Sequence, residues 1–170
     1  MATVASERAV IPAGTWTVDP VHSNIGFQVV DTSDLMSTIT GRFTDFEGTF
    51  EAGDDPASAR AHGVIRAASV TTDQEQRDAH LRSLDFFDTD RYPEIGFETT
   101  RIEAVEADRV RVTGTLTIKE QPQHVVLHGR VVTGTSSKGE ERLIFQSNGG
   151  ITWGPMSVEI TASLSAVKQG

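Results

Sequence analysis

The sequence predicts an all-β fold, built as an antiparallel barrel or sandwich. Apolar and polar residues alternate with period two through most of the 170 residues, which is the pattern of half-buried strands. Short turns containing Gly, Asp or Pro separate most of these segments, and a single segment has the pattern of a helix. Because parallel strands need a crossover helix between them, the strands are expected to be antiparallel.

The first part of the chain is expected to hold three strands. The first covers residues 16–30, and its alternation is interrupted at Asp19 and Pro20, where the chain should bend. The second covers residues 41–53 and carries three of the eight phenylalanines. A short third strand is expected over residues 60–71.

Residues 74–84 break the β pattern and are expected to form a short helix. Thr72 and Glu75 have the spacing of a capping box, in which a hydroxyl and a carboxylate satisfy the first free backbone donors of a helix. Two leucines of the segment share one helical face. Pro93 then prevents helical continuation and leads into the next strand. A lone helix between strands of a small barrel commonly covers an end or an open edge.

Five further strands complete the predicted fold. The clearest alternation is in "RVRVTGTLTIK", where Val, Val, Leu and Ile share one face. All eight strands and the helix are expected to form one domain over residues 14–168, after a flexible N-terminus of residues 1–13. The five strands are expected over residues 94–103, 109–119, 124–134, 142–147 and 157–167.

The composition excludes several classes of function. The net charge of −9 argues against nucleic-acid partners and against adsorption to anionic membranes. The chain has no cysteine, which excludes disulfides, thiolate zinc sites and cysteine nucleophiles. No apolar run approaches the roughly 18 residues of a membrane span. The N-terminal segment lacks the apolar core of a secretory signal. We therefore expect a cytoplasmic protein without integral membrane association, unless an export signal has been removed.

No arrangement of residues in the sequence points to a metal or to catalysis. His124 and His128 have the spacing of a ligand pair on a helix, but on a strand they would lie about 13 Å apart. Asp19, His22 and Ser23 are the residue types of a catalytic triad, yet adjacent residues of a strand point to opposite faces. We expect no metal, no cofactor and no catalytic residue.

The phenylalanines favour an apolar cavity instead. The interior of an eight-stranded barrel is just wide enough to be filled by side chains or to hold one small ligand. Small residues on or near the inward faces, such as Gly114, Gly129 and Ala162, would leave room beside the large ones.

Several motifs together resemble the YceI-like family. "WTVDPVHSNIGFQV", "GRFTDFEGTF", "RDAHLRSLDFFDTDRYPEIGF", "VTGTLTIK" and "VVLHGRV" occur in the family's order between residues 16 and 167. The resemblance implies an extended lipocalin-like barrel of eight antiparallel strands with a long apolar interior. It also implies a carrier of polyisoprenoids, quinone-like or fatty amphiphiles, and many members are periplasmic. Residues 146–153 lack the family's Arg-Asp-Phe-Gly-like segment, which puts any head-group contact made there in doubt.

Two groups of residues are candidates for the site. Phe86 and Phe87 are expected to anchor the helix and the turn after it. Arg77, His80 and Tyr92 are expected first to hold the helix on the barrel, with contact to a ligand head group or gating as the alternative. The apolar lining is expected to comprise Phe27, Phe43, Phe50, Phe97, Leu116, Ile118, Leu127 and Phe145.

The leading interpretation is a binding or carrier protein that holds a polyisoprenoid or similar long-chain lipid without chemical change. An alternative is an isomerase or hydrolase that uses the same pocket with His22 or His80 as base. A second alternative is a barrel with a filled core that serves as a partner-binding scaffold. A homodimer is also expected, because exposed strand edges and barrel mouths invite symmetric pairing.

Overall fold

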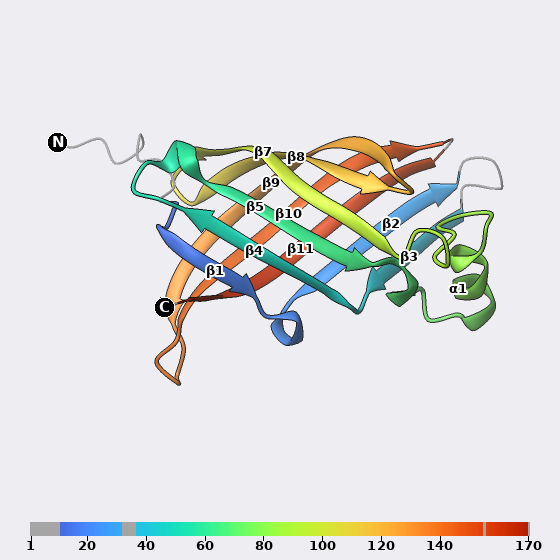
Figure 1. Cartoon of the computed structure of the whole chain (residues 1–170), viewed down its shortest axis with the longest axis horizontal. Helices are drawn as coiled ribbons and strands as arrows, with labels where there is room; N and C mark the ends of the chain where they lie inside the picture. Colours follow the sequence, from blue (N-terminus) through green and yellow to red (C-terminus); the bar gives the residue numbers. More distant parts are fainter. Residues whose placement is uncertain (1–10, 32–36, 155, 170) are drawn as a thin grey trace.

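Eleven strands in the described part of the chain, residues 11–31, 37–154 and 156–169 of this computed structural model, form a single antiparallel sheet (Figure 1). The predicted flexible N-terminus, residues 1–13, lies mostly outside the described residues. The strands are β1 (Gly14–Val18), β2 (Asn24–Asp31), β3 (Ser37–Phe43), β4 (Phe46–Ala52), β5 (Arg60–Arg66), β6 (Val70–Thr71), β7 (Glu94–Glu106), β8 (Arg109–Ile118), β9 (Gln121–Thr135), β10 (Glu141–Trp153) and β11 (Met156–Lys168).

Eight of these strands close into a barrel. The ring follows the order β1–β4–β5–β7–β8–β9–β10–β11, and it closes where β1 pairs with β11. The barrel is longer than it is wide, and both described ends of the chain lie at the end opposite the helix (Figure 1). The predicted eight-stranded antiparallel barrel with one short helix is confirmed.

The first two predicted strands are each bent into two. β1 and β2 lie one after the other along the same edge of β11, separated by the short 3-10 turn η2 (Pro20–His22). The carboxylate of Asp19 caps this turn by accepting a hydrogen bond from the backbone N–H of Val21 at 3.1 Å. β3 and β4 bend at Thr44 and Asp45, because β3 pairs with β2 while β4 pairs with β1.

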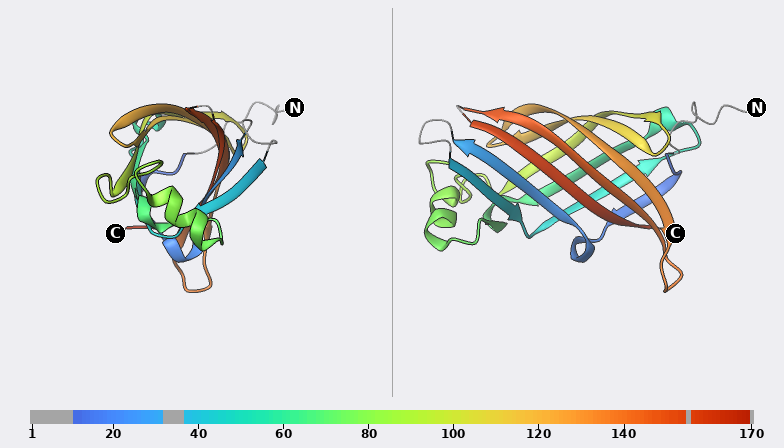
Figure 2. Two further views of the ribbon diagram at one scale, coloured as in Figure 1. Left: turned by 90° about the vertical axis from the view of Figure 1, so that its right-hand side faces the viewer. Right: turned by 180° about the vertical axis from the view of Figure 1, so that it is seen from behind.

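The strand ladder is incomplete at one end of the barrel, and helix α1 (Glu75–Arg82) covers that end. On the side away from β2, β3 pairs only with β6, through Arg42–Thr71 and Phe43–Val70. The left view of Figure 2 looks onto this end, where α1 lies across the lower part of the opening. Asp73, which lies between β6 and α1, pairs with Arg42 of β3 at 3.2 Å, so the segment that leads into the helix covers part of this edge.

The helix is slightly shorter than the predicted range of residues 74–84, and its cap differs from the prediction. The N-cap is Gln74, whose side-chain oxygen accepts a hydrogen bond from the backbone N–H of Arg77. The predicted capping box of Thr72 and Glu75 is wrong. The Thr72 hydroxyl bonds to Asp78 in the second turn of the helix instead.

Four aromatic side chains fill the interior beneath α1, and we call Phe27, Phe43, Phe87 and Trp153 the end cluster. Phe87, from the turn after the helix, stacks on Trp153 with ring centroids 5.1 Å apart. The rings of Phe87 and Phe43 meet edge to face with centroids 5.9 Å apart, and the rings of Phe43 and Phe27 are tilted with centroids 5.5 Å apart. Leu81 of α1 packs against the same core. Phe87 thus anchors the turn, as predicted.

Asp78 fastens α1 to the strand before it. Its carboxylate is buried and accepts hydrogen bonds from the Thr72 backbone N–H at 2.7 Å, the Thr72 hydroxyl at 2.5 Å and the Thr71 hydroxyl at 3.2 Å. Arg77 donates from Nε to the Thr72 hydroxyl at 2.8 Å and from Nη2 to the Thr72 carbonyl at 3.0 Å. Burial pushes the pKa of Asp78 upward, but the hydrogen bonds outweigh burial and hold that pKa below its ordinary value.

We predict that Asp78→Asn lowers the free energy of unfolding by about 1–3 kcal/mol at pH 7, because an amide cannot accept all of these hydrogen bonds. Since the pKa is lowered on folding, the contribution is fully present above the unfolded pKa of about 3.9 and is lost as the pH falls through the folded pKa. Urea denaturation of both proteins between pH 7 and pH 3 should show the difference shrink.

The matched control is Asp90→Asn, since Asp90 is exposed in the turn after the helix. It should change the free energy of unfolding by less than about 0.5 kcal/mol. Equal losses in the two variants, or a loss at Asp78 that does not depend on pH, would contradict this account of α1.

Candidate functional site

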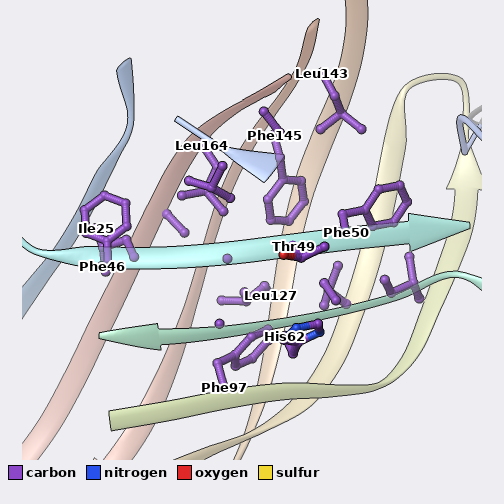
Figure 3. A pocket seen from close by; sticks show the side chains of 18 of the residues that line it. Ile25, Phe46, Thr49, Phe50, His62, Phe97, Leu127, Leu143, Phe145 and Leu164 are labelled. Carbon is purple, nitrogen blue, oxygen red and sulfur yellow. The ribbon is translucent and has the colours of Figure 1, made fainter. Parts of the chain in front are cut away.

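An apolar cavity of about 180 Å³ lies inside the barrel (Figure 3). Its walls come from all eight ring strands and from β2. The period-two geometry of strands explains which residues line it, as β11 illustrates. Four alternate residues of that strand face the cavity, namely Ile160, Ala162, Leu164 and Ala166.

The cavity has two different ends. Toward α1 the end cluster fills the interior, and the described lining includes no residue of α1 or of the turn that follows it. Toward the other end the lining extends to Ile11 and Pro12, which precede β1. The cavity therefore runs from the aromatic end cluster toward the end where β1 begins.

The structure separates the eight predicted lining residues into two groups. Five line the cavity, and three lie in the core beneath α1. All eight are on inward faces, but alternation along a strand does not tell how far along the barrel axis a residue lies. Contact of any of them with a ligand stays a prediction. The first group is Phe50, Phe97, Leu116, Leu127 and Phe145, and the second is Phe27, Phe43 and Ile118.

Two glycines do not leave the space that the sequence suggested. A Cβ added at Gly114 would lie 3.0 Å from the ring of Phe97, and one added at Gly129 would lie 2.9 Å from the ring of Phe145. Each ring leans over the glycine of the neighbouring strand, so the glycine provides the surface on which the ring rests. Ala162, the third small residue, does line the cavity.

A pair of glycines that the sequence did not single out also lines the cavity. Gly48 of β4 and Gly63 of β5 are directly opposite each other, and both line the cavity. Two adjacent strands thus contribute only backbone to the wall at this point. Alternation could have placed both glycines on inward faces, because each lies two residues from an inward apolar residue. Only strand pairing could show that they face each other.

The polar residues that border the cavity belong to the outer face. His62 is opposite Thr49 on one side and opposite the exposed Glu98 on the other, so its side chain shares their face (Figure 3). Glu47 is exposed and pairs with Arg66 at 2.9 Å. Neither the carboxylate nor the imidazole is therefore aimed at the interior.

The three polar candidates of the helical region do not line the cavity. Arg77 is bonded to Thr72, as described above. His80 is exposed, with Nε2 3.0 Å from a carboxylate oxygen of Asp85. Tyr92 is half-buried and lies under the Arg91 guanidinium, 5.4 Å from the ring centroid. Arg77 thus helps to hold the helix, whereas the contacts of His80 and Tyr92 are local, and contact of any of the three with a head group stays a prediction.

His22 forms a dyad with Asp19 at the bend between β1 and β2. Nδ1 of His22 lies 2.7 Å from Oδ2 of Asp19, and Arg142 Nη1 donates to the same oxygen at 3.2 Å. The hydrogen bonds from His22 and Arg142 outweigh burial and lower the pKa of Asp19. The Ser23 hydroxyl donates to the Asp19 carbonyl at 2.7 Å and accepts from the Ser165 backbone N–H at 2.9 Å. None of these groups lines the cavity.

Two further features are absent from the described residues. No group of three or more His, Asp or Glu side chains in that part of the chain is arranged to hold a metal ion. None of its helices is both long enough and apolar enough to cross a membrane.

Comparison with known proteins places this fold in a family. The model of the YceI-like domain matches residues 16–166. UPF0312 protein plu2095 of Photorhabdus laumondii is 34% identical over 132 residues, which cover 76% of this chain and 67% of that protein. These findings confirm the resemblance seen in the sequence.

Two solved structures share the fold. BcnA of Burkholderia cenocepacia is similar with a TM-score of 0.72 at 20% identity, over 87% of this chain and 98% of that one. A polyisoprenoid binding domain from Saccharophagus degradans is similar with a TM-score of 0.65 at 16% identity, over 91% of this chain and 98% of that one. At these identities the likeness is one of fold.

The close contact at Gly129 leads to a prediction. Gly129→Ala would place a methyl group 2.5 Å from the Gln146 carbonyl oxygen and 2.9 Å from the Phe145 ring. We expect it to lower the free energy of unfolding by about 1–3 kcal/mol, measured by urea denaturation. Gly134→Ala on the same strand is the control, because nothing lies within 4 Å of its added methyl group. Equal stability of the two variants would show that β9 and β10 do not approach so closely.

Proposed function

The chain belongs to the family of YceI-like domains, and from its cavity we propose that it binds a lipid-like amphiphile and carries it without chemical change. The tail class that we propose is polyisoprenoid or a similar long chain. The observation that carries this proposal is the apolar cavity, closed toward α1 by the end cluster.

Hydrophobic burial supplies the driving force for such binding. Each Å² of apolar tail removed from water contributes about 25 cal/mol, before the entropy of binding is subtracted. A long tail offers a large apolar area, whereas a small polar molecule would gain little from walls of this kind. The end cluster gives the tail a floor on which its last carbons can rest.

The shape of the cavity supports a branched tail. Its wall is uneven, because the rings of Phe97 and Phe145 line one part of it and the two glycines Gly48 and Gly63, which add no side chain, line another. A tail with regularly spaced methyl branches can fit such an uneven wall, and a straight chain would leave gaps there at a cost in lost contacts. The neighbour from Saccharophagus degradans, described as a polyisoprenoid binding domain, has the same fold.

The placement of the titratable groups favours a carrier over an enzyme. A general base must come within hydrogen-bond reach of the proton that it removes. His22 and His80, the two candidate bases, are bonded to aspartates outside the cavity. A ligand in the cavity would meet apolar side chains and backbone. A cytoplasmic location and a homodimer remain part of this proposal as predictions.

Mass spectrometry of freshly purified protein tests the proposal, first under native conditions and then after solvent extraction. We expect one lipid for each chain, with the fragmentation pattern of an isoprenoid or a related long-chain amphiphile. A protein that is empty, and that takes up neither geranylgeraniol nor a ubiquinone probe, would rule out the carrier function and leave the filled-core scaffold.

A second prediction tests the cavity itself. Gly48→Leu should fill part of the cavity, because a Cβ there points at Val18 from 3.3 Å and needs only a small adjustment. The affinity for geranylgeraniol, measured by displacement of a fluorescent probe, should fall about tenfold or more, while the unfolding midpoint changes little.

Gly96→Leu is the matched control for this prediction. It makes the same exchange on the outer face of β7, where nothing lies within 4 Å of an added Cβ. An equal loss of affinity in both variants, or no loss in either, would show that the lipid binds elsewhere.

A further inference from the structure

The indole N–H of Trp16 is buried without a hydrogen-bond acceptor. Trp16 is 3% exposed, and in the described part of the chain no acceptor lies within hydrogen-bond distance of Nε1. Buried tryptophans usually place this group against a partner, because an unpaired buried donor has lost its water and gained nothing in return. An acceptor atom on a bound molecule would satisfy this indole N–H.

Trp16 lies beside the end of the cavity that is farther from α1. It packs on Leu143 and Ala166, with Phe50 half-buried against the same group, and these three residues line the cavity. Ile11 and Pro12, at the limit of the lining, precede Trp16 by only a few residues. Whatever occupies the cavity would thus reach its end next to the indole.

A lysine shares this position. Lys168 is directly opposite Trp16 in the β1–β11 ladder, and it continues the inward alternation of Leu164 and Ala166. Lys168 is the last residue of β11. Its side chain therefore leaves the strand on the inner face, and its ammonium group can still reach water at the end of the barrel. Its side chain is 39% exposed, with Nζ 5.9 Å from the centroid of the Trp16 ring.

The aliphatic part of Lys168 and the indole donor both lie next to Gly14. A Cβ built at Gly14 would lie 3.0 Å from Cε of Lys168 and 3.5 Å from Nε1 of Trp16, so the three groups converge. Gly14 has a φ of +119°, and its missing side chain leaves room for the lysine to lie there.

In the described part of the chain the Lys168 ammonium group makes two weak contacts, one with the Trp16 ring and one with an exposed carboxylate. Nζ of Lys168 lies 3.2 Å from a carboxylate oxygen of Glu141, whose side chain is 59% exposed. Ion pairs with this exposure are readily exchanged in water. The pair also shows that an oxyanion fits beside this ammonium group.

We propose that Trp16 and Lys168 form the head-group subsite of the cavity, and that it takes an amphiphile whose head carries an anionic oxygen, as a phosphate or a carboxylate does. This inference rests on the proposed function. The head displaces Glu141 from the Lys168 ammonium and accepts a hydrogen bond from the indole N–H of Trp16, while the tail extends toward the end cluster. Because the chain carries a net charge of −9, an anionic head is held here by these local donors and not by the general field of the protein.

The test compares two probes with the same tail, geranylgeranyl phosphate and geranylgeraniol, by isothermal titration calorimetry. The wild-type protein should bind the phosphate about tenfold more tightly than the alcohol. Lys168→Met should abolish this preference, and Trp16→Phe, which keeps an aromatic ring without the donor, should reduce it about threefold or more. Lys138→Met, an exposed lysine in the loop before β10, should leave the preference unchanged.

A spectroscopic readout needs no change at Trp16. In Trp153→Phe protein the indole ¹H–¹⁵N signal comes from Trp16 alone, and it should move downfield on addition of geranylgeranyl phosphate and not of geranylgeraniol. Inorganic phosphate alone should leave it unmoved. Movement by inorganic phosphate at the same concentration would overturn the head-group assignment, because the tail would then contribute nothing.

These measurements distinguish failure of the head-group subsite from failure of the proposed carrier function. If both probes bind with equal affinity to the wild-type and variant proteins, the subsite is wrong and the carrier function stands. If neither probe binds to the wild-type protein, the proposed function itself fails.

Discussion

The pairing of β1 with β11 is the contact on which the rest of this structure depends. It comprises three residue pairs, yet it joins the two ends of the chain and closes the sheet. Closure encloses every second side chain of each strand, and so creates an interior with no free edge along the ring. β1 pairs with both β11 and β4. The chain then bends at Asp19, and β2 pairs with the next part of β11. β2 and β3 then lie outside the closed ring, and β6 pairs with the end of β3 that leads into β4.

The two ends of the barrel follow from this arrangement. At the α1 end, hydrogen bonds to Asp78 hold the helix, and Phe87 enters the interior to stack on Trp153. At the opposite end the inner face of the β1–β11 pair ends on Trp16 and Lys168. The interior thus passes from an apolar floor to a donor and a cation. An amphiphile likewise has an apolar end and a polar end, so one orientation of the ligand is favoured.

The width of the interior depends on where glycines and rings meet across strands. Gly114 and Gly129 each lie beneath a phenylalanine of the next strand, which brings the ring close to the wall and keeps the centre open. Gly48 and Gly63 face each other without a ring within 4 Å of their Cβ positions, so the wall there is backbone alone. The same residue type therefore supports a side chain at one place and leaves space at another, according to its neighbours in the sheet.

The sequence by itself determined the strands, their inward faces, the helix and the family, because periodicity and turn residues are local properties of the chain. It placed Phe97 and Phe43 on inward faces alike. Only the tertiary structure decided that one lines the cavity and the other fills the end beneath α1, since depth along the axis depends on strand register. Tertiary structure alone also set Lys168 against Trp16, because closure of a barrel joins residues from opposite ends of the chain.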